Sequence, residues 1–227
     1  MLSRSDIWVD FGLSGLAKWL SSPAASGLEQ REVVGEAVEW GEGAYASTLL
    51  SDAERLLASS LTTEAVNVLW SAAVRRAYAE GAPWLDGRAW LREIVGLVTE
   101  RYDVAELSAL RGDGGPDVGP ALRAAVLAEI EAMAAPLAAA TESDRAGAVR
   151  GVVPVLRRVV TEVDPDLGFR FFLRALKAYG VPITESRYLR YHELGERLGY
   201  HELVVDDGSL QVEGEGEGEA SPASREA

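Results

Sequence analysis

Apolar residues recur at helical spacing along most of this chain of 227 residues. After Thr62, for example, Val66, Leu69, Trp70 and Ala73 fall at positions i, i+3, i+4 and i+7. A one-sided apolar stripe of this period is typical of amphipathic helices that pack on a common core. Similar stripes occupy residues 90–98, 122–137 and 149–163. The sequence therefore predicts a mostly α-helical, bundle-like protein of about eight or nine helices.

Capping signals place the boundaries of the last two long helices. Asp164 followed by Pro165 predicts a helix start, because Asp is a good N-cap and Pro is tolerated in the first turn. Gly180 is expected to end that helix, since glycine readily adopts the left-handed conformation found after helix C-termini. Thr184 is then expected to begin the last helix.

Three weaker local signals add detail to this outline. Ser51 and Glu54 match a capping box, which predicts a short helix over residues 54–59. Pro154 is expected to kink the helix that carries the stripe at 149–163, because proline cannot donate a backbone hydrogen bond. Near the N-terminus, the alternation of Ile7, Val9 and Phe11 is compatible with a short strand.

Two stretches divide the chain. Residues 111–120 (RGDGGPDVGP) are dense in Gly, Pro and Asp, as expected of a connection. All six tryptophans precede this stretch, which predicts an N-terminal part (1–110) with an indole-rich core. Residues 120–207 form the C-terminal helical part, and the two parts are either separate subdomains or one bundle. Residues 208–227 are acidic and of low complexity, which predicts a disordered tail.

The charge is strongly negative and unevenly distributed. The formal net charge is −14, of which −7 lies in residues 1–114, zero in 115–201 and −7 in 202–227. Such a chain repels nucleic-acid phosphates and anionic lipids and attracts basic partners. We therefore expect a basic protein partner and no nucleic acid.

Other features of the composition narrow the class of protein. The chain contains no cysteine, which excludes disulfides and thiolate catalysis. The most apolar stretch, Leu122–Ala140, is interrupted by Arg123, Glu129 and Glu131, so no membrane span is expected. Acidic residues near the N-terminus argue against a signal peptide, which indicates a cytoplasmic protein. The large excess of arginine over lysine, with abundant Ala and Gly, indicates a bacterial genome rich in GC.

Four glutamates form a candidate partner-binding face. Glu29, Glu32, Glu36 and Glu39 fall at i, i+3, i+7 and i+10, which aligns their carboxylates along one side of a helix. Like charges at this spacing destabilise a helix by about 0.2–0.5 kcal/mol per pair. Two interpretations stay open: the row is an ordinary solvated face, or it contacts a basic partner.

Arg170, Arg174 and Lys177 form a basic row on a later helix. One interpretation is a site for an anion or a phosphate group. The other is an interdomain contact, in which the row pairs with the acidic N-terminal part and docks the two halves of the chain.

The segment from His192 to Glu202 (HELGERLGYHE) resembles the signature of the metzincin zinc proteases, H-E-x-x-H-x-x-G-x-x-H. His192, Glu193 and Gly199 match the first ligand, the general base and the turn glycine of that family. However, Glu196 replaces the second ligand histidine and His201 comes one residue early for the third. Because zinc hydrolases need three well-placed protein ligands, we expect neither a metal nor another cofactor.

These observations favour a partner-binding protein without catalytic activity. The most specific hypothesis is a bacterial inhibitor of the immunity or antitoxin kind, whose acidic face covers a basic target. One alternative is a helix-turn-helix transcriptional regulator, with Arg187 and Arg190 on its second helix. A third hypothesis is an enzyme that uses carboxylates alone or a metal bound by His192, Glu196 and His201. No complete catalytic constellation supports it.

Overall fold

A computed structural model describes residues 7, 9–25, 29–75, 86–110, 119–145 and 147–213. Within these ranges the chain forms twelve α-helices, two 3-10 helices, one π-helical turn and two short strands. The mostly α-helical prediction is confirmed, but the expected number of eight or nine helices is too low. The elements are α1 (Gly12–Leu20), η2 (Pro23–Ala25), α2 (Gln30–Glu39), η3 (Trp40–Gly43), α3 (Ala44–Ala58), α4 (Thr63–Val74), α5 (Gly87–Arg101), α6 (Val104–Leu110), α7 (Pro120–Ala132), α8 (Ala134–Glu142), α9 (Val152–Arg158), the π-turn η4 (Val159–Val163), α10 (Pro165–Tyr179), β1 (Pro182–Thr184), α11 (Glu185–Arg197), α12 (Glu202–Val205) and β2 (Gln211–Glu213).

The predicted boundaries of the last two long helices are confirmed. The side chain of Asp164 accepts a hydrogen bond of 3.0 Å from the backbone N–H three residues later, and Pro165 is the first residue of α10. Gly180 follows α10 in the left-handed conformation, with φ at 57°. Thr184 caps α11 in the same manner as Asp164 caps α10, through a hydrogen bond of 3.4 Å.

Three local predictions are wrong. Ser51 does not begin a short helix, because α3 passes through this position without a break. Pro154 does not kink its helix, because α9 begins at Val152 and places the proline in the first turn, where its missing N–H costs no helical hydrogen bond. Ile7 and residues 9–11 form no strand; Phe11 is instead the N-cap residue of α1.

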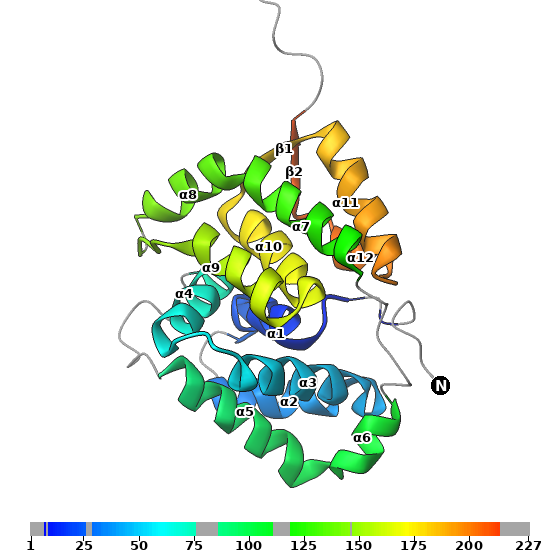
Figure 1. Cartoon of the computed structure of the whole chain (residues 1–227). Helices are drawn as coiled ribbons and strands as arrows, with labels where there is room; N and C mark the ends of the chain where they lie inside the picture. Colours follow the sequence, from blue (N-terminus) through cyan, green and yellow to red (C-terminus); the bar gives the residue numbers. More distant parts are fainter. Residues whose placement is uncertain are drawn as a thin grey trace, which may run out of the picture.

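Helix α10 lies at the centre of the fold, between the N-terminal helices and the layer that contains α7, α8 and α11 (Figure 1). It contacts α1 and α4 on one side and α7, α8 and α9 on the other. Every residue of α10 except Ala178 is buried. Buried side chains from 1–110 and from 120–207 belong to one hydrophobic cluster, so α10 links the cores of both parts. Residues 111–118 of the predicted connection lie outside the described residues.

The N-terminal core consists mainly of Leu, Val and Ala rather than of indoles. Of the tryptophans that the structure describes, only Trp90 is buried, and Trp40 is 51% exposed. Trp19 and Trp70 pack against the core from its edge. The prediction of an indole-rich core is therefore wrong for these residues, because the narrow spaces between closely packed helices are filled by smaller side chains.

The predicted disordered tail begins too early. Leu210 is only 8% exposed, and Gln211 to Glu213 form strand β2, which pairs in parallel with β1. Residues from Gly208 to Glu213 are therefore part of the fold, and residues 214–227 lie outside the described part of the chain. The composition of residues 208–213 did not reveal this pairing, because a strand of three exposed residues has no burial pattern.

Within the described residues, no single helix combines the length and the apolar composition needed to cross a membrane. Helices α7 and α8 meet those two criteria only when taken together, and their axes differ by 55°.

Candidate functional site

The basic row on α10 is buried rather than exposed. Arg170 is 1% exposed, and Arg174 and Lys177 are each 8% exposed. The three positions fall at i, i+4 and i+7, so they lie on one side of α10. This side faces α1, α3 and α4 of the N-terminal part. A buried charge destabilises a fold by several kcal/mol unless it is paired, so the partners of each side chain decide what the row does.

Arg170 is held by two carboxylates. Its Nη1 and Nη2 donate to Asp52 over 2.8 Å and 2.7 Å, and Nη2 also donates to Asp166 over 3.2 Å. Asp166 in turn accepts a hydrogen bond of 2.5 Å from the hydroxyl of Tyr200. Burial opposes the charge on Arg170, but the two carboxylates outweigh burial and hold its pKa well above the usual value. The resulting ionic cluster joins α3 to α10.

Arg174 and Lys177 extend this polar interior along α10. Arg174 donates to the backbone carbonyl of Ala73 over 2.8 Å and to the hydroxyl of Ser21 over 2.9 Å. Lys177 donates to the carbonyl of Val204 and lies 3.6 Å from Asp207. Burial lowers the pKa of both cations, against the attraction of nearby carboxylates. Neither side chain presents a charge to solvent that would bind an external anion.

Asp207 connects the C-terminal segment to this row. It forms ion pairs with Lys177 and with Lys18 on α1. Burial by itself raises the pKa of Asp207, but the charge of Lys177 and the hydrogen bonds from Lys18 and Ser209 outweigh burial and hold the pKa below its usual value. The segment after α12 is therefore fixed across α1 and α10 by charge.

An open hollow lies beside this ionic interior. Its walls come from α1 and the segments on either side of it, from η3 and from the start of α3, and it has a volume of about 260 Å³. The indoles of Trp19 and Trp40 meet at an interplanar angle of 75°, with ring centroids 6.4 Å apart. The residues around the hollow are Val9, Asp10, Gly15, Lys18, Trp19, Ser22, Trp40 and Tyr45.

Asp10 is the acidic group of the hollow. It is 6% exposed, and its carboxylate accepts a hydrogen bond of 2.7 Å from Ser14. Among the residues that the structure describes, no cation forms an ion pair with it. Arg174 and Lys177 are near enough to be influenced by its charge, but each donates its hydrogen bonds to other groups. Within the described part of the chain, the Asp10 side chain is therefore largely buried and accepts a hydrogen bond from one hydroxyl, that of Ser14.

The four predicted partner-binding glutamates lie on the exposed side of α2 or at its N-cap. Glu29, Glu32, Glu36 and Glu39 are all exposed. Glu32 accepts a hydrogen bond of 3.0 Å from the backbone N–H of Glu29, and Glu39 pairs with Arg101 on α5 over 2.9 Å. The side chains of Glu32 and Glu39 thus have local roles, whereas Glu36 forms no ion pair with the described residues. The row ends where Trp40 and the hollow begin.

The histidines of the zinc-protease-like segment lie on both sides of a second hollow. His192 belongs to α11 and packs against Tyr188, with ring centroids 4.6 Å apart and the ring planes tilted by 57°. His201 is the N-cap of α12, and its Nδ1 accepts from the backbone N–H of Leu203 over 3.2 Å. Although Glu196 also borders this hollow, no group of three or more acidic, histidine or cysteine side chains in the described parts is placed to hold a metal.

The arginines of the regulator hypothesis serve an internal contact. Arg187 and Arg190 of α11 both pair with Glu129 of α7, over 3.1 Å and 2.8 Å. Glu129 is only 6% exposed. This contact fixes α11 against α7.

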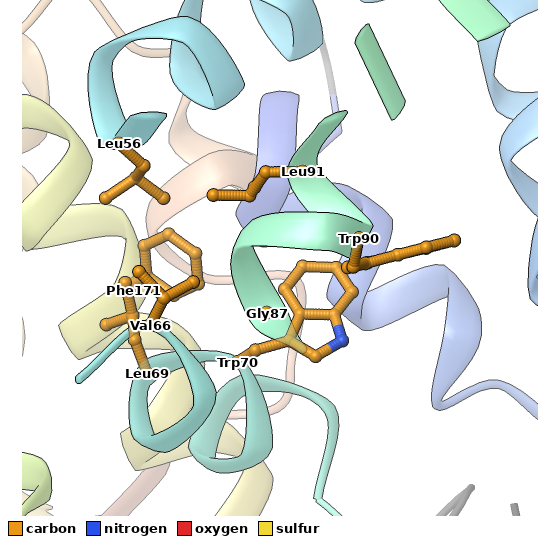
Figure 2. Close-up of a pocket in the computed structure, with 8 residues that line it drawn as sticks. All are labelled: Leu56, Val66, Leu69, Trp70, Gly87, Trp90, Leu91 and Phe171. Atoms are coloured by element: carbon orange, nitrogen blue, oxygen red, sulfur yellow. The ribbon is translucent and has the colours of Figure 1, made fainter. Parts of the chain in front are cut away.

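A small apolar gap separates α3, α4, α5 and α10 (Figure 2). Leu56, Leu91 and Phe171 face it from three sides, and Trp70 lies beside Gly87 at its edge. The gap measures about 10 Å³, which is at the lower limit for one water molecule. It is therefore a packing gap and not a binding site.

Comparisons with protein-family models, with curated proteins and with solved structures found no match to this chain.

The individual acidic partners of the basic row were not predicted from the sequence. Asp52 lies three residues after Leu49 and four before Leu56, which places it on the apolar side of α3. Arg170 likewise lies between two buried phenylalanines. Opposite charges flanked by apolar residues, at Asp52 and at Arg170, were the available signal for a buried ion pair, but the short helix predicted over residues 54–59 left Asp52 outside any helix. No comparable signal brought Asp10 together with Trp19 and Trp40.

Proposed function

We propose that this protein binds a basic protein partner and that its contact surface is the exposed face of α2 with the adjoining hollow. The most specific form of the proposal is an inhibitor of the immunity or antitoxin kind. The observation that carries it is the continuity of a row of exposed carboxylates with a hollow that contains an exposed indole, Trp40. Aromatic side chains supply much of the affinity at protein interfaces, and rim charges accelerate association.

The charge of the chain agrees with this surface. The chain carries a net charge of −14, so a basic partner is attracted at long range. Glu36 has no ion pair among the described residues, and its carboxylate is therefore available to an external cation. The buried row Arg170, Arg174 and Lys177 is occupied internally, which leaves α2 as the better candidate surface of the two.

Differential capture followed by kinetics tests this proposal. The wild type and the variant Glu32→Lys/Glu36→Lys are immobilised and exposed to lysate from the source cell. The matched control is Glu142→Lys/Glu193→Lys, which changes two exposed glutamates on α8 and α11 and alters the net charge equally. We expect a basic protein that binds the wild type and the control but is lost from the α2 variant.

Association rates of that captured protein, measured at two ionic strengths, complete the test. Reversal of the α2 glutamates should slow association and flatten its salt dependence, because rim charges act mainly on the on-rate. The control should change the rate much less. Equal effects of the two double variants would show that only net charge matters and would contradict a contact surface on α2.

A further inference from the structure

The hollow beside α1 combines two features. It is lined by two indoles whose rings are nearly perpendicular to each other, and it is also lined by Asp10, which is 6% exposed. Indole faces attract cations through the quadrupole of the ring. A carboxylate held away from water is a strong acceptor for a charged donor. Both features favour a cationic group as the occupant.

The cations near the hollow already donate hydrogen bonds to other groups. Lys18 borders the hollow, but its ammonium group pairs with Asp207. Arg174 donates to Ala73 and Ser21, and Lys177 to Val204. Of the ionised side chains that border the hollow, Asp10 is therefore the one without an ion pair in the described structure. An incoming cation would complete its hydrogen bonding.

We infer that this hollow binds an arginine side chain of the basic partner, with the guanidinium stacked on Trp19 or Trp40 and hydrogen-bonded to Asp10. The inference rests on the proposed function and identifies the group that the site recognises. A volume of about 260 Å³ admits one long side chain, whereas a helix, with a diameter of about 10–12 Å, does not fit.

Guanidinium suits the hollow better than ammonium does. It is planar and weakly hydrated, so it stacks on an indole while its edge donates two hydrogen bonds to one carboxylate. An ammonium group is strongly hydrated and loses more on entering a partly enclosed site. Glu36 and Glu39 are both exposed and precede Trp40 by four residues and by one residue, so the acidic end of α2 adjoins the hollow.

Capped tripeptides test the inference without the natural partner. The probes are acetyl-Gly-Arg-Gly-amide, the same peptide with citrulline, which is the neutral counterpart of arginine, and the same peptide with lysine. Binding is followed through the indole N–H signals of ¹⁵N-labelled full-length protein. The signals of Trp19 and Trp40 are assigned from their loss in Trp19→Phe and Trp40→Phe.

We expect the arginine peptide to shift the Trp19 and Trp40 signals in a saturable manner. The citrulline and lysine peptides should bind at least about tenfold and about threefold more weakly, respectively. Asp10→Asn keeps the acceptor for Ser14 and should weaken binding of the arginine peptide by about tenfold, while it removes the preference over citrulline. Glu193→Gln, a control at an exposed position of α11, should bind like the wild type.

Trp40→Ala is a second variant whose effect on binding is not confused with a loss of core packing, because Trp40 is 51% exposed. It should weaken binding about fivefold with little change in melting temperature. The inference is overturned if the arginine peptide shifts neither indole, if citrulline or lysine binds equally well, or if Asp10→Asn binds like the wild type.

The two proposals fail independently. If no peptide binds but Glu32→Lys/Glu36→Lys still slows association of the captured partner, the arginine site is wrong and the binding surface on α2 stands. If the arginine peptide binds but reversal of the α2 glutamates has no effect, the surface on α2 is wrong and the hollow alone is the site.

Discussion

Arg170 and Asp52 form a double hydrogen-bonded ion pair in the interior of the protein, with N···O distances of 2.8 Å and 2.7 Å. The two residues are 118 positions apart in the sequence and belong to α10 and α3. Because a buried ion pair requires a fixed geometry, this contact constrains how the N-terminal and C-terminal helices pack. It lies a short distance along the interior from Asp10, since both Arg170 and Asp10 contact Ser14.

Arg170→Met should destabilise the protein strongly. The substitution keeps an apolar stem but leaves Asp52 and Asp166 buried without their cation, which costs about 3–5 kcal/mol. Urea denaturation at pH 7 measures the loss. Arg55→Met is the control, because Arg55 pairs with Asp164 at the surface with 44% of its side chain exposed, and such pairs contribute about 0–1 kcal/mol. Equal losses in both variants would contradict the importance of the buried pair.

Gly12→Ala should also disturb this ion pair. A methyl group at Gly12 would lie 2.0 Å from Oδ2 of Asp52 and 2.9 Å from Nη1 of Arg170, and Gly12 has a φ of +60°. Both the clash and the left-handed conformation oppose a side chain, so we expect a loss of at least about 2 kcal/mol. Gly96→Ala is the matched control, because a methyl group there meets no described atom within 4 Å. It should stabilise α5 by about 0.5–1 kcal/mol in the same denaturation assay.

The sequence predicted the helical fold and its clearest boundaries, because those depend on local physics. The stripe at Trp90, Ile94, Leu97 and Val98 is buried as its spacing indicated. Other features depend on contacts between distant segments. The pairing of β2 with β1 and the burial of Leu210 cannot be read from residues 208–213, whose own composition favours disorder.

The candidate site was less accessible to sequence reasoning than the fold. Glu36 was identified because helical spacing alone places it on an exposed face. Arg170 was recognised as part of a row, but spacing does not distinguish a basic row on the surface from one that is neutralised in the core. Asp10 and Trp40 are separated by α1 and α2, so their proximity at the hollow follows only from the packing of those helices.

Asp207→Asn should make the free energy of unfolding depend less on pH in the acidic range. The pKa of Asp207 is lower in the folded protein than in the unfolded chain, so its ionised form stabilises the fold above about pH 4 and this contribution is lost as the pH falls below that value. At pH 7 the variant should lose about 2 kcal/mol, because Lys177 remains buried without an ion-pair partner. Denaturation curves from pH 7 to pH 3 should show the wild type approaching the variant. A difference that is constant with pH would contradict this prediction.

Purified protein should carry no stoichiometric zinc. His201 uses Nδ1 to cap α12, and the described residues supply no third ligand near His192 in a metal-binding arrangement. Elemental analysis measures the metal content directly. In the metal-free protein, His201→Ala should lower the free energy of unfolding by about 1 kcal/mol, because the N-cap of α12 is lost. His201→Asn should keep the stability of the wild type, because asparagine is also a good N-cap. One zinc per chain that disappears in His192→Ala would revive the hydrolase hypothesis.

Two truncations should separate the folded part of the C-terminal segment from its acidic extension. Cutting after Asp207 removes Leu210, whose side chain is buried, together with the pairing of β2 with β1. Burial of a leucine contributes about 1.5–3 kcal/mol. We therefore expect a loss of about 2 kcal/mol and a melting temperature lower by roughly 5 °C for a chain of this size.

Cutting after Glu213 should leave the melting temperature unchanged, because the Glu-Gly repeats that follow cannot bury apolar surface. Thermal unfolding followed by circular dichroism distinguishes the two truncated chains. If both truncated chains melt at the temperature of the full-length chain, β2 contributes nothing to stability. If both melt at an equally lower temperature, stabilising contacts lie beyond Glu213.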